Sequence, residues 1–292
     1  IEMNFGKIMT AMVTIFDKNG ELDENETKKI IKKLCKEGTK TIVVAGSTGE
    51  GPTLLLTETI KLTKWVIEHK NPETKVIVNV GTNNTKETNE IIKVIQGIHG
   101  VDGLMVVCPY YNKPSQEGMY QHFKSINEVS ELPLLVYHIP GRTNVTLELD
   151  TFKKIVDLDK VKLVKESSGD LIKTGALIDY IKEKKMLVDV YSGDDPTILP
   201  YMSMGAKGII SVAAHLKGKE IKNMIDLFEK GNVSEAAKEQ RKLNIFVEKL
   251  FPSFAPNPVA LKYFLAKEGF GNEEVRLPLT KMTEEEKKKL TH

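Results

Sequence analysis

Short apolar runs alternate with stretches of helical periodicity along almost the whole chain. Most of the apolar runs are hydrophobic at successive positions, as in residues 42–45 and 104–107, which is typical of strands covered on both faces of a parallel sheet. Eight runs are predicted to be strands, at residues 8–16, 41–45, 75–80, 103–108, 134–139, 161–165, 187–191 and 208–212.

Helices are predicted between these runs. Asp23 and Glu26 form a capping pair before the first helix, and Gly38 marks its end. Asp195 and Pro196 suit the cap and first position of another helix. Six helices are predicted after the first one, at residues 57–70, 85–96, 118–129, 149–158, 171–184 and 195–204. The alternation with short loops predicts an α/β fold, a (β/α)8 TIM barrel.

Three further helices are predicted after the last strand, at residues 218–229, 233–250 and 258–268. We therefore expect a catalytic barrel over residues 1–217 and a C-terminal helical subdomain over residues 218–292. A doubly wound open sheet is the competing fold, but it usually carries a glycine-rich phosphate loop after its first strand, and residues 15–20 do not supply one.

The amino-acid composition disfavours several classes of function. The 292 residues are 40% hydrophobic and 28% charged, as in globular proteins, and no apolar run approaches the roughly 20 residues that cross a bilayer. The net charge of +2 comes with scattered lysines, which disfavours a nucleic-acid partner. Cys35 and Cys108 form neither a disulfide framework nor a CxxC pair, and we expect both to be small core residues. Without a basic segment followed by an apolar one at the N-terminus, the prediction is a cytoplasmic protein.

The carboxyl ends of the strands should gather the active site of such a barrel. Lys165 ends the sixth predicted strand and is followed at once by a polar turn. Burial disfavours the charged form of an amine, and the neutral form is a nucleophile toward a ketone. We hypothesise that Lys165 forms a Schiff base; the alternative is a surface lysine in a lysine-rich chain.

The second predicted strand ends in a turn at residues 46–50 that carries Ser47 and Thr48. Two hydroxyls and free amide groups at a helix start can hold a carboxylate, and glycines in the turn allow unusual backbone angles. The alternative is an ordinary turn in which Ser47 or Thr48 caps the next helix.

Tyrosines and an arginine follow the fourth and fifth strands. The hydroxyls of Tyr111 and Tyr137 could pass protons along a hydrogen-bonded chain, whereas Tyr110 is expected to serve packing. Arg142, in a loop, is suited to hold a carboxylate bidentately, although a surface role is open. His138 has no second histidine or paired carboxylate at ligand spacing, so it is expected to be structural or to support residues that contact the substrate.

The seventh and eighth strands end in backbone that could line a small ligand, at Gly193 and Ile210. Asp194 and Asp195 could suggest a metal, but the helix-cap interpretation is preferred, and no metal or cofactor is expected. A lysine, tyrosines, hydroxyls and an arginine suit a class I lyase or aldolase acting on a small keto acid. The imine turns the ketone into an electron sink, so a neighbouring bond can break without a metal.

Four groups of residues carry a family resemblance that extends from Gly6 to Pro278. They resemble the motifs of the pyruvate-dependent Schiff-base lyases, and most closely those of the dihydrodipicolinate synthase family. The groups are residues 46–50, residues 109–114, Tyr137 with residues 140–143, and Lys165 with Gly169 and Asp170.

This resemblance implies a condensation of pyruvate with L-aspartate 4-semialdehyde in lysine and diaminopimelate biosynthesis. It implies that Lys165 forms the imine, that Tyr137 gives and takes the proton, and that Ser47 and Tyr111 complete the hydroxyl relay. By the same resemblance, Tyr111 reaches the neighbouring subunit's site in a homotetramer built from two tight dimers.

The resemblance also implies how the substrates are held. Thr48 and the backbone at Ile210 would hold the carboxylate of pyruvate, and Gly193 is expected to be a further substrate-binding residue. Arg142 would bind the carboxylate of the semialdehyde at the site entrance.

Two departures from the family pattern leave alternatives open. Ser47 stands where synthases usually carry Thr and sialic acid lyases often carry Ser, and His138 stands where Asn is common. The alternative enzyme is therefore similar to N-acetylneuraminate lyase or is another pyruvate-dependent aldolase of the same superfamily, although Arg142 favours the synthase. A non-catalytic barrel that binds a keto acid is the second alternative. Residues 51–56 lack the polar and histidine positions of lysine-sensitive members, which predicts weak or absent feedback inhibition by lysine.

Overall fold

The chain folds as the predicted barrel. The computed structural model describes residues 4–291, and its eight strands form a closed barrel in sequence order, from β1 to β8. The ends of the two predicted domains, at residues 1–3 and 292, lie outside the described residues. The strands are β1 Ile8–Ala11, β2 Thr41–Val44, β3 Lys75–Asn79, β4 Gly103–Val107, β5 Leu134–His138, β6 Val161–Glu166, β7 Asp189–Ser192 and β8 Gly208–Ser211.

A helix or a short helical turn follows each strand. The α-helices are α1 Glu24–Lys36, α2 Leu56–His69, α3 Thr85–Ile95, α4 Gln116–Val129, α5 Pro140–Thr143, α6 Leu149–Val156, α7 Leu171–Glu183, α8 Ile198–Ser203, α9 Ala214–Glu229, α10 Val233–Leu250, α11 Val259–Lys267 and α12 Glu284–Leu290. Two 3-10 turns, η1 Gly51–Thr53 and η2 Asp195–Thr197, complete the helical segments of residues 4–291. Within the same range, every helix is too short or too polar to span a bilayer.

The chain divides into two compact units. One contains the residues up to 7 together with 75–210, and the other contains residues 8–74 together with those from 211 onward. The predicted division into residues 1–217 and 218–292 stays a prediction.

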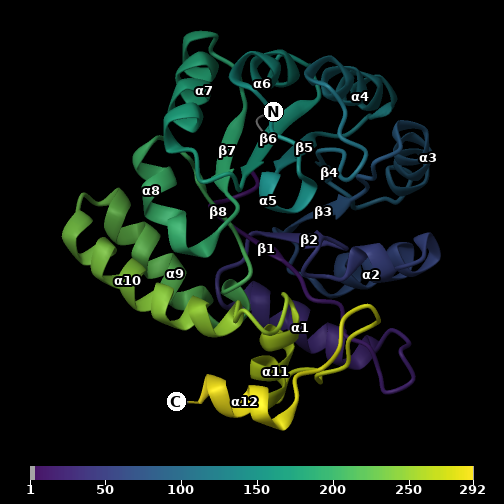
Figure 1. Cartoon of the computed structure of the whole chain (residues 1–292), viewed down its shortest axis with the longest axis vertical. Coiled ribbons are helices and arrows are strands. Elements are labelled where there is room, and N and C mark those ends of the chain that lie inside the picture. The colour runs from purple at the N-terminus through teal and green to yellow at the C-terminus, as the bar shows by residue number, and fades with distance from the viewer. Residues whose placement is uncertain (1–3, 292) are drawn as a thin grey trace. The chain divides into compact units, whose positions relative to one another are not determined.

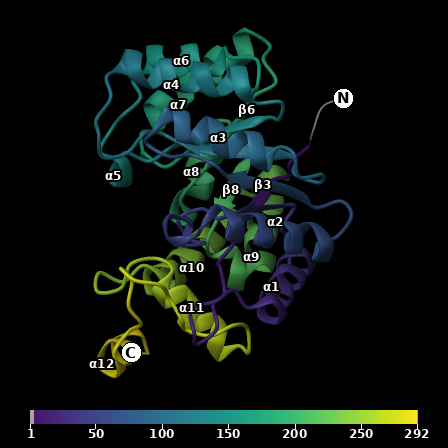
Figure 2. The same cartoon turned by 90° about the vertical axis from the view of Figure 1, so that its right-hand side faces the viewer.

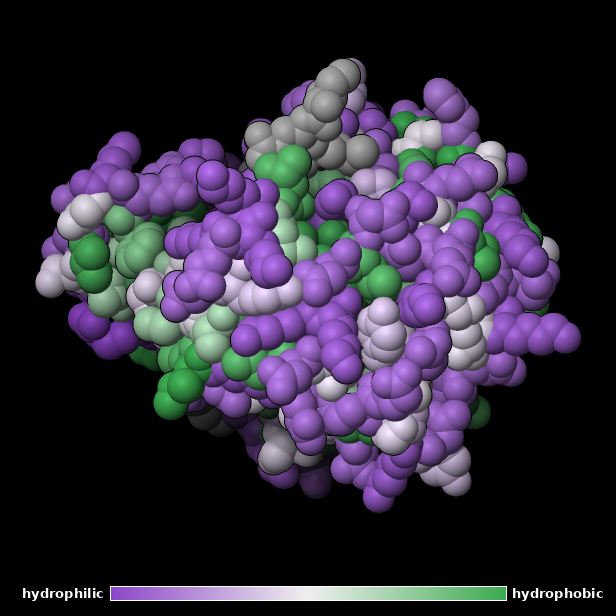
Figure 3. Space-filling model, turned by 90° about the horizontal axis from the view of Figure 1, so that it is seen from above, coloured by the Kyte–Doolittle hydropathy of each residue, from purple (hydrophilic) through white to green (hydrophobic). Residues whose placement is uncertain are grey.

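The first unit holds strands β3 to β8. Its apolar runs are buried at nearly every position, as the continuous hydrophobicity predicts. Helices α3, α4, α6 and α7 lie around the outer side of these strands (Figure 1). Their outward positions are polar, and hydrophilic side chains cover most of the molecular face seen in Figure 3. Strands β5 and β6 are parallel, and their register sets Tyr137 opposite Lys165 and His138 opposite Glu166.

The second unit holds β1 and β2, helices α1 and α2, and the C-terminal helices. The Asp23 side chain accepts a hydrogen bond from the Glu26 N–H at 3.0 Å, as the capping pair predicts. Helices α9 and α10 lie side by side in Figures 1 and 2, and α10 has the predicted bounds of residues 233–250. The final helix, α12, was not predicted; it begins with a capping box between Thr283 and Glu286.

Several element boundaries differ from the sequence prediction, for example at α9, which begins at Ala214 instead of residue 218. Strand β1 ends at Ala11 instead of residue 16, because the chain then leaves the sheet, and Phe16 forms an isolated bridge with Leu22. Helix α5 has four residues, too few for a periodic pattern to predict. Asp195 is the first residue of η2 instead of its cap, and Asp194 occupies the cap position.

Candidate active site

Lys165 lies buried near the end of β6. Its side chain has 6% of its surface exposed, so it is not a surface lysine. Its Nζ atom lies 4.0 Å from the centroid of the Tyr137 ring, the residue opposite it on β5. Burial lowers the pKa of Lys165 to about 8, although the carboxylates of Asp194 and Asp195 act in the opposite direction. At this pKa a substantial fraction of the amine is neutral, and therefore nucleophilic, near neutral pH.

Tyr137 is buried on β5, and its phenol faces the same group of charges. Burial raises the pKa of Tyr137 to about 12, and the negative charge of Asp194 acts in the same direction, whereas Arg142 and the nearby Ser167 hydroxyl act in the opposite direction. The phenol therefore stays protonated at neutral pH and can donate a proton to a developing oxyanion or a basic nitrogen nearby.

Gly193 makes the packing around Lys165 possible. A Cβ atom built on Gly193 would lie 1.8 Å from Ser167 Oγ and 3.1 Å from Lys165 Cγ, so no larger residue fits without moving one of them. The sequence predicted a role for Gly193 in lining a ligand; the structure adds this steric requirement.

Ser167 is a polar residue of this group that the sequence analysis missed. Its Oγ atom is buried and has no hydrogen-bond partner of ordinary geometry within residues 4–291, yet it lies close enough to the Tyr137 phenol to lower the pKa of that group. The available signal was its position two residues after Lys165, since alternate residues of an extended chain lie on the same side.

Asp194 and Asp195 supply negative charge beside the lysine. Burial raises the pKa of Asp194 to about 6, against the opposing effect of Lys165. Above that pKa the Asp194 carboxylate is ionised and favours the protonated form of Lys165. From the sequence, the two aspartates suggested a metal or, preferably, a helix start at Asp195 and Pro196. Their electrostatic effect on Lys165 follows instead from the closeness of β6 and β7.

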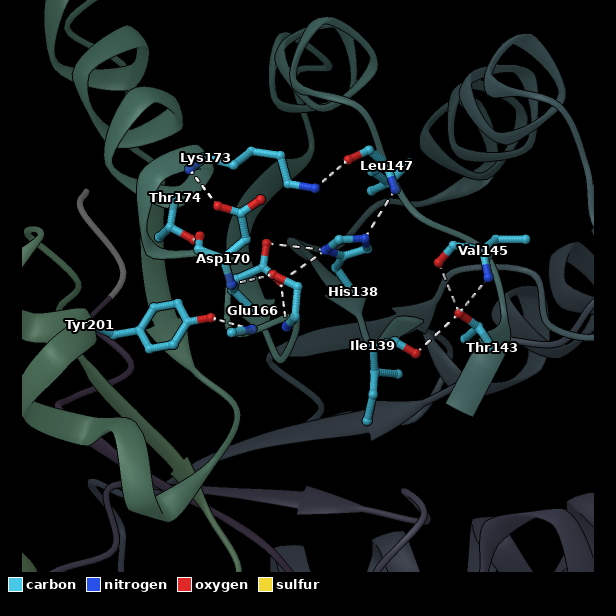
Figure 4. A network of polar contacts seen from close by, with 12 residues as sticks. His138, Ile139, Thr143, Val145, Leu147, Glu166, Asp170, Lys173, Thr174 and Tyr201 are labelled. Atoms are coloured by element: carbon cyan, nitrogen blue, oxygen red, sulfur yellow. Dashed lines mark hydrogen bonds and ion pairs between the residues drawn. The ribbon is translucent and has the colours of Figure 1, made fainter. Parts of the chain in front are cut away.

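Arg142 projects from α5 into an exposed position. The helix is short, and Thr143 closes it, because its Oγ1 donates to the Ile139 carbonyl at 3.1 Å (Figure 4). The charge of Arg142 lowers the pKa of both Lys165 and Tyr137, so the guanidinium acts on the same site. An exposed guanidinium next to buried ionisable groups is suited to hold an anionic substrate at the entrance.

Tyr111 lies at the surface, in the turn after β4. Its side chain is 86% exposed, and its backbone is left-handed, with a φ of 76°. The Tyr111 N–H donates to the Thr143 carbonyl at 3.3 Å, which ties the turn after β4 to the end of α5. Tyr110 is 38% exposed, more than its predicted packing role suggests. Ile210, by contrast, is buried on β8.

Ser47 and Thr48 belong to the second unit, in the turn after β2. Ser47 is exposed, whereas Thr48 is buried and its Oγ1 accepts a hydrogen bond from Asn257 Nδ2 at 2.9 Å. The left-handed residues of this turn are Ala45 and Glu50, not the glycines as predicted. Gly51 is needed for space instead, because a Cβ atom there would lie 2.0 Å from the Ala45 carbonyl oxygen.

Comparison with known proteins gives a consistent family assignment. The sequence model of the dihydrodipicolinate synthetase family matches residues 4–292. The 4-hydroxy-tetrahydrodipicolinate synthase of Bacillus subtilis is 42% identical over 290 residues, which are 99% of this chain and 98% of that protein.

Solved structures agree with the sequence relatives. A dihydrodipicolinate synthase from Bacillus anthracis superposes with a TM-score of 0.93 at 41% identity, covering 99% of this chain and 97% of that one. The enzyme from Acinetobacter baumannii, solved in complex with pyruvate, superposes with a TM-score of 0.92 at 34% identity, with the same coverage of 99% and 97%.

Proposed function

The chain belongs to the dihydrodipicolinate synthetase family, and on that premise we propose that it condenses pyruvate with L-aspartate 4-semialdehyde, as a 4-hydroxy-tetrahydrodipicolinate synthase does. The observation that carries the proposal is the buried Lys165, with a pKa of about 8 and its Nζ atom 4.0 Å from the Tyr137 ring centroid.

The proposed reaction begins at Lys165. Its neutral amine attacks the keto carbon of pyruvate, and the keto oxygen leaves as water, so that an imine forms. Loss of a methyl proton then gives an enamine, whose carbon attacks the aldehyde carbon of the semialdehyde, and the aldehyde oxygen becomes a hydroxyl. The amino group of the semialdehyde finally displaces Lys165 from the former keto carbon, which closes the ring and frees the enzyme.

Tyr137 is the proposed proton donor and acceptor in these steps. Its raised pKa keeps the phenol protonated until a stronger base forms beside it. We propose that Ser47 and Tyr111 extend the relay, with Tyr111 supplied by a second copy of the chain. The exposed Tyr111 side chain supports this division, because an 86% exposed phenol is free to reach a neighbour.

Substrate binding is assigned to four positions. We propose that Thr48, Gly193 and the backbone at Ile210 hold the pyruvate carboxylate, and that Arg142 holds the carboxylate of the semialdehyde. The exposure of Arg142 and its electrostatic effect on Lys165 support a place at the entrance.

We propose a homotetramer assembled as two tight dimers, since the relay would be incomplete in a single chain. The cytoplasm is the proposed compartment, in keeping with the free thiols of Cys35 and Cys108.

Borohydride reduction in the presence of pyruvate, followed by intact mass, tests the first step. The expected result is a mass gain in the wild type that is lost in Lys165→Ala; an unchanged wild-type mass, or an equal gain in the variant, would overturn the Schiff-base assignment. Turnover with aspartate semialdehyde, compared with turnover with N-acetylneuraminate, tests the substrate. Arg142→Ala should reduce semialdehyde use more than imine formation, and an equal loss of both would make Arg142 structural.

A further inference from the structure

His138 and Glu166 form a buried pair directly after Tyr137 and Lys165. The two residues lie opposite each other in the register of β5 and β6, one position beyond the Tyr137 and Lys165 pair. His138 Nδ1 lies 2.8 Å from Glu166 Oε1 and 3.1 Å from Oε2, and both side chains are buried (Figure 4).

The hydrogen bonds fix the protonation pattern of the His138 ring. The Leu147 N–H donates to Nε2 at 3.0 Å, so Nε2 carries a lone pair and the ring hydrogen is on Nδ1. The Nδ1–H therefore donates to the Glu166 carboxylate. Glu166 Oε1 also accepts from the Ser168 N–H at 2.9 Å. The ring is held from both sides in a single tautomer, as the dashed lines in Figure 4 show.

This network ties together four segments of the first unit. It joins the end of β5, the end of β6, the turn that follows β6 and the segment that leads into α6. Because successive residues of a strand point to opposite faces, the pair lies behind the face that carries Tyr137 and Lys165. Phe152 of α6 packs edge-on against the His138 ring, with ring centroids 5.3 Å apart. The pair therefore has no path to substrate, but it holds the two strand ends that carry the reacting groups.

We infer that the His138–Glu166 pair is a positioning device that sets the Tyr137 phenol relative to the Lys165 amine. The inference rests on the proposed function, since it concerns the rate of imine formation at Lys165. A misplacement of a reacting group by about 1 Å can lower the rate on the order of 10²-fold. A hydrogen bond that fixes the spacing of the two strand ends should therefore affect the rate of imine formation.

Two substitutions of His138 separate its two hydrogen bonds. In His138→Asn, the side-chain NH2 can replace the Nδ1–H that donates to Glu166, but the acceptor for Leu147 is lost. In His138→Gln, the side-chain oxygen can replace Nε2 and accept from Leu147, but the donor to Glu166 is lost. Comparing them assigns any effect to one bond.

The experiment measures the rate of borohydride-trapped imine formation as a function of pyruvate concentration, together with thermal unfolding. We expect His138→Gln to lower the maximal trapping rate by about 10²-fold, with half-saturation by pyruvate changed little, and His138→Asn to stay within a few-fold of wild type. Glu166→Gln, which keeps an acceptor for His138, should resemble wild type, and Glu166→Ala should resemble His138→Gln. The two Glu166 variants test the same hydrogen bond if a His138 variant does not fold.

His122 provides a matched control. It is a second buried histidine of the same unit, on α4, and its Nδ1 lies 2.7 Å from Thr85 Oγ1. His122→Gln should change thermal stability without changing the trapping rate of the folded protein. Wild-type trapping rates in folded His138→Gln and Glu166→Ala, or equal losses in His138→Asn and His138→Gln, would overturn the inference. Failure of the wild type to trap pyruvate would instead overturn the proposed function.

Discussion

The lowered pKa of Lys165 predicts a specific pH dependence of imine formation. Burial brings the pKa from 10.5 to about 8. At pH 7.5 about a quarter of such an amine is neutral, whereas a lysine of ordinary pKa would be about 0.1% neutral. The fold thus raises the concentration of the nucleophile by on the order of 10²-fold, equivalent to about 3 kcal/mol.

The assay is a series of short incubations with pyruvate between pH 6 and pH 10, each ended by borohydride in a common quench buffer and read by intact mass. The initial trapping rate should rise about tenfold per pH unit below pH 7 and level off above about pH 9, where roughly nine tenths of an amine with a pKa of about 8 is neutral. Lys162→Met serves as a control, since it removes a half-buried lysine from the same strand. Its profile should match that of the wild type.

Asp194→Asn extends the same test. The Asp194 carboxylate raises the pKa of Lys165, so its removal should move the midpoint of the trapping profile below that of the wild type. A trapping rate that keeps rising to pH 10 in the wild type would show that Lys165 titrates as an ordinary lysine, and would refute the argument from burial. A midpoint that rises in Asp194→Asn would refute the assigned direction of the Asp194 effect.

Four further predictions concern stability, packing and regulation. Lys165→Met should raise the free energy of unfolding by roughly 2–3 kcal/mol at pH 7, because folding lowers the pKa of the lysine that the substitution removes. In paired denaturant titrations of the variant and the wild type, this gain in stability should persist below pH 8 and disappear as the pH rises to 10.5. Gly193→Ala should slow imine trapping, since its Cβ would meet Ser167 Oγ at 1.8 Å, and a wild-type rate would show that Ser167 can move freely. Lys262→Met should cost about 3–5 kcal/mol of folding free energy, because the buried Glu50 carboxylate loses its ion-pair partner. The double variant Lys262→Met/Glu50→Gln should be closer to wild type, and an equal loss in both variants would contradict this explanation. Lysine should inhibit weakly or not at all in a steady-state assay, and a micromolar inhibition constant would contradict this.

The fold was predictable because its signal is repeated. Continuous apolar runs and capped helices recur along the chain, and a misplaced boundary changes one element without changing the alternation. The boundaries that failed lie where periodicity is too short to read, as in α5, or where the chain leaves the sheet while staying buried, as after β1.

The chemistry of the site was only partly predictable. The position of Lys165 at a strand end predicted a desolvated amine, and Lys165 is buried in the structure. Three features of the site depend on distances between neighbouring strands. They are the effect of Asp194 on the pKa of Lys165, the lack of space for a side chain at Gly193, and the burial of the Ser167 hydroxyl. The order of residues along the chain does not contain these distances. For the same reason, the sequence did not predict that His138 pairs with Glu166.

Residues of the C-terminal segment contact the turn after β2 within the second unit. Asn257 donates to the hydroxyl of Thr48, and Lys262 of α11 forms a buried ion pair with Glu50. The Arg276 N–H donates to the other oxygen of the Glu50 carboxylate at 3.0 Å. Three C-terminal residues therefore hold the single turn that presents Ser47 and Thr48. A buried carboxylate at a left-handed position would be costly without these partners. If Thr48 binds pyruvate as proposed, the C-terminal helices are part of the catalytic apparatus, and a division of the chain at residues 217 and 218 would separate that turn from the residues that fix its shape.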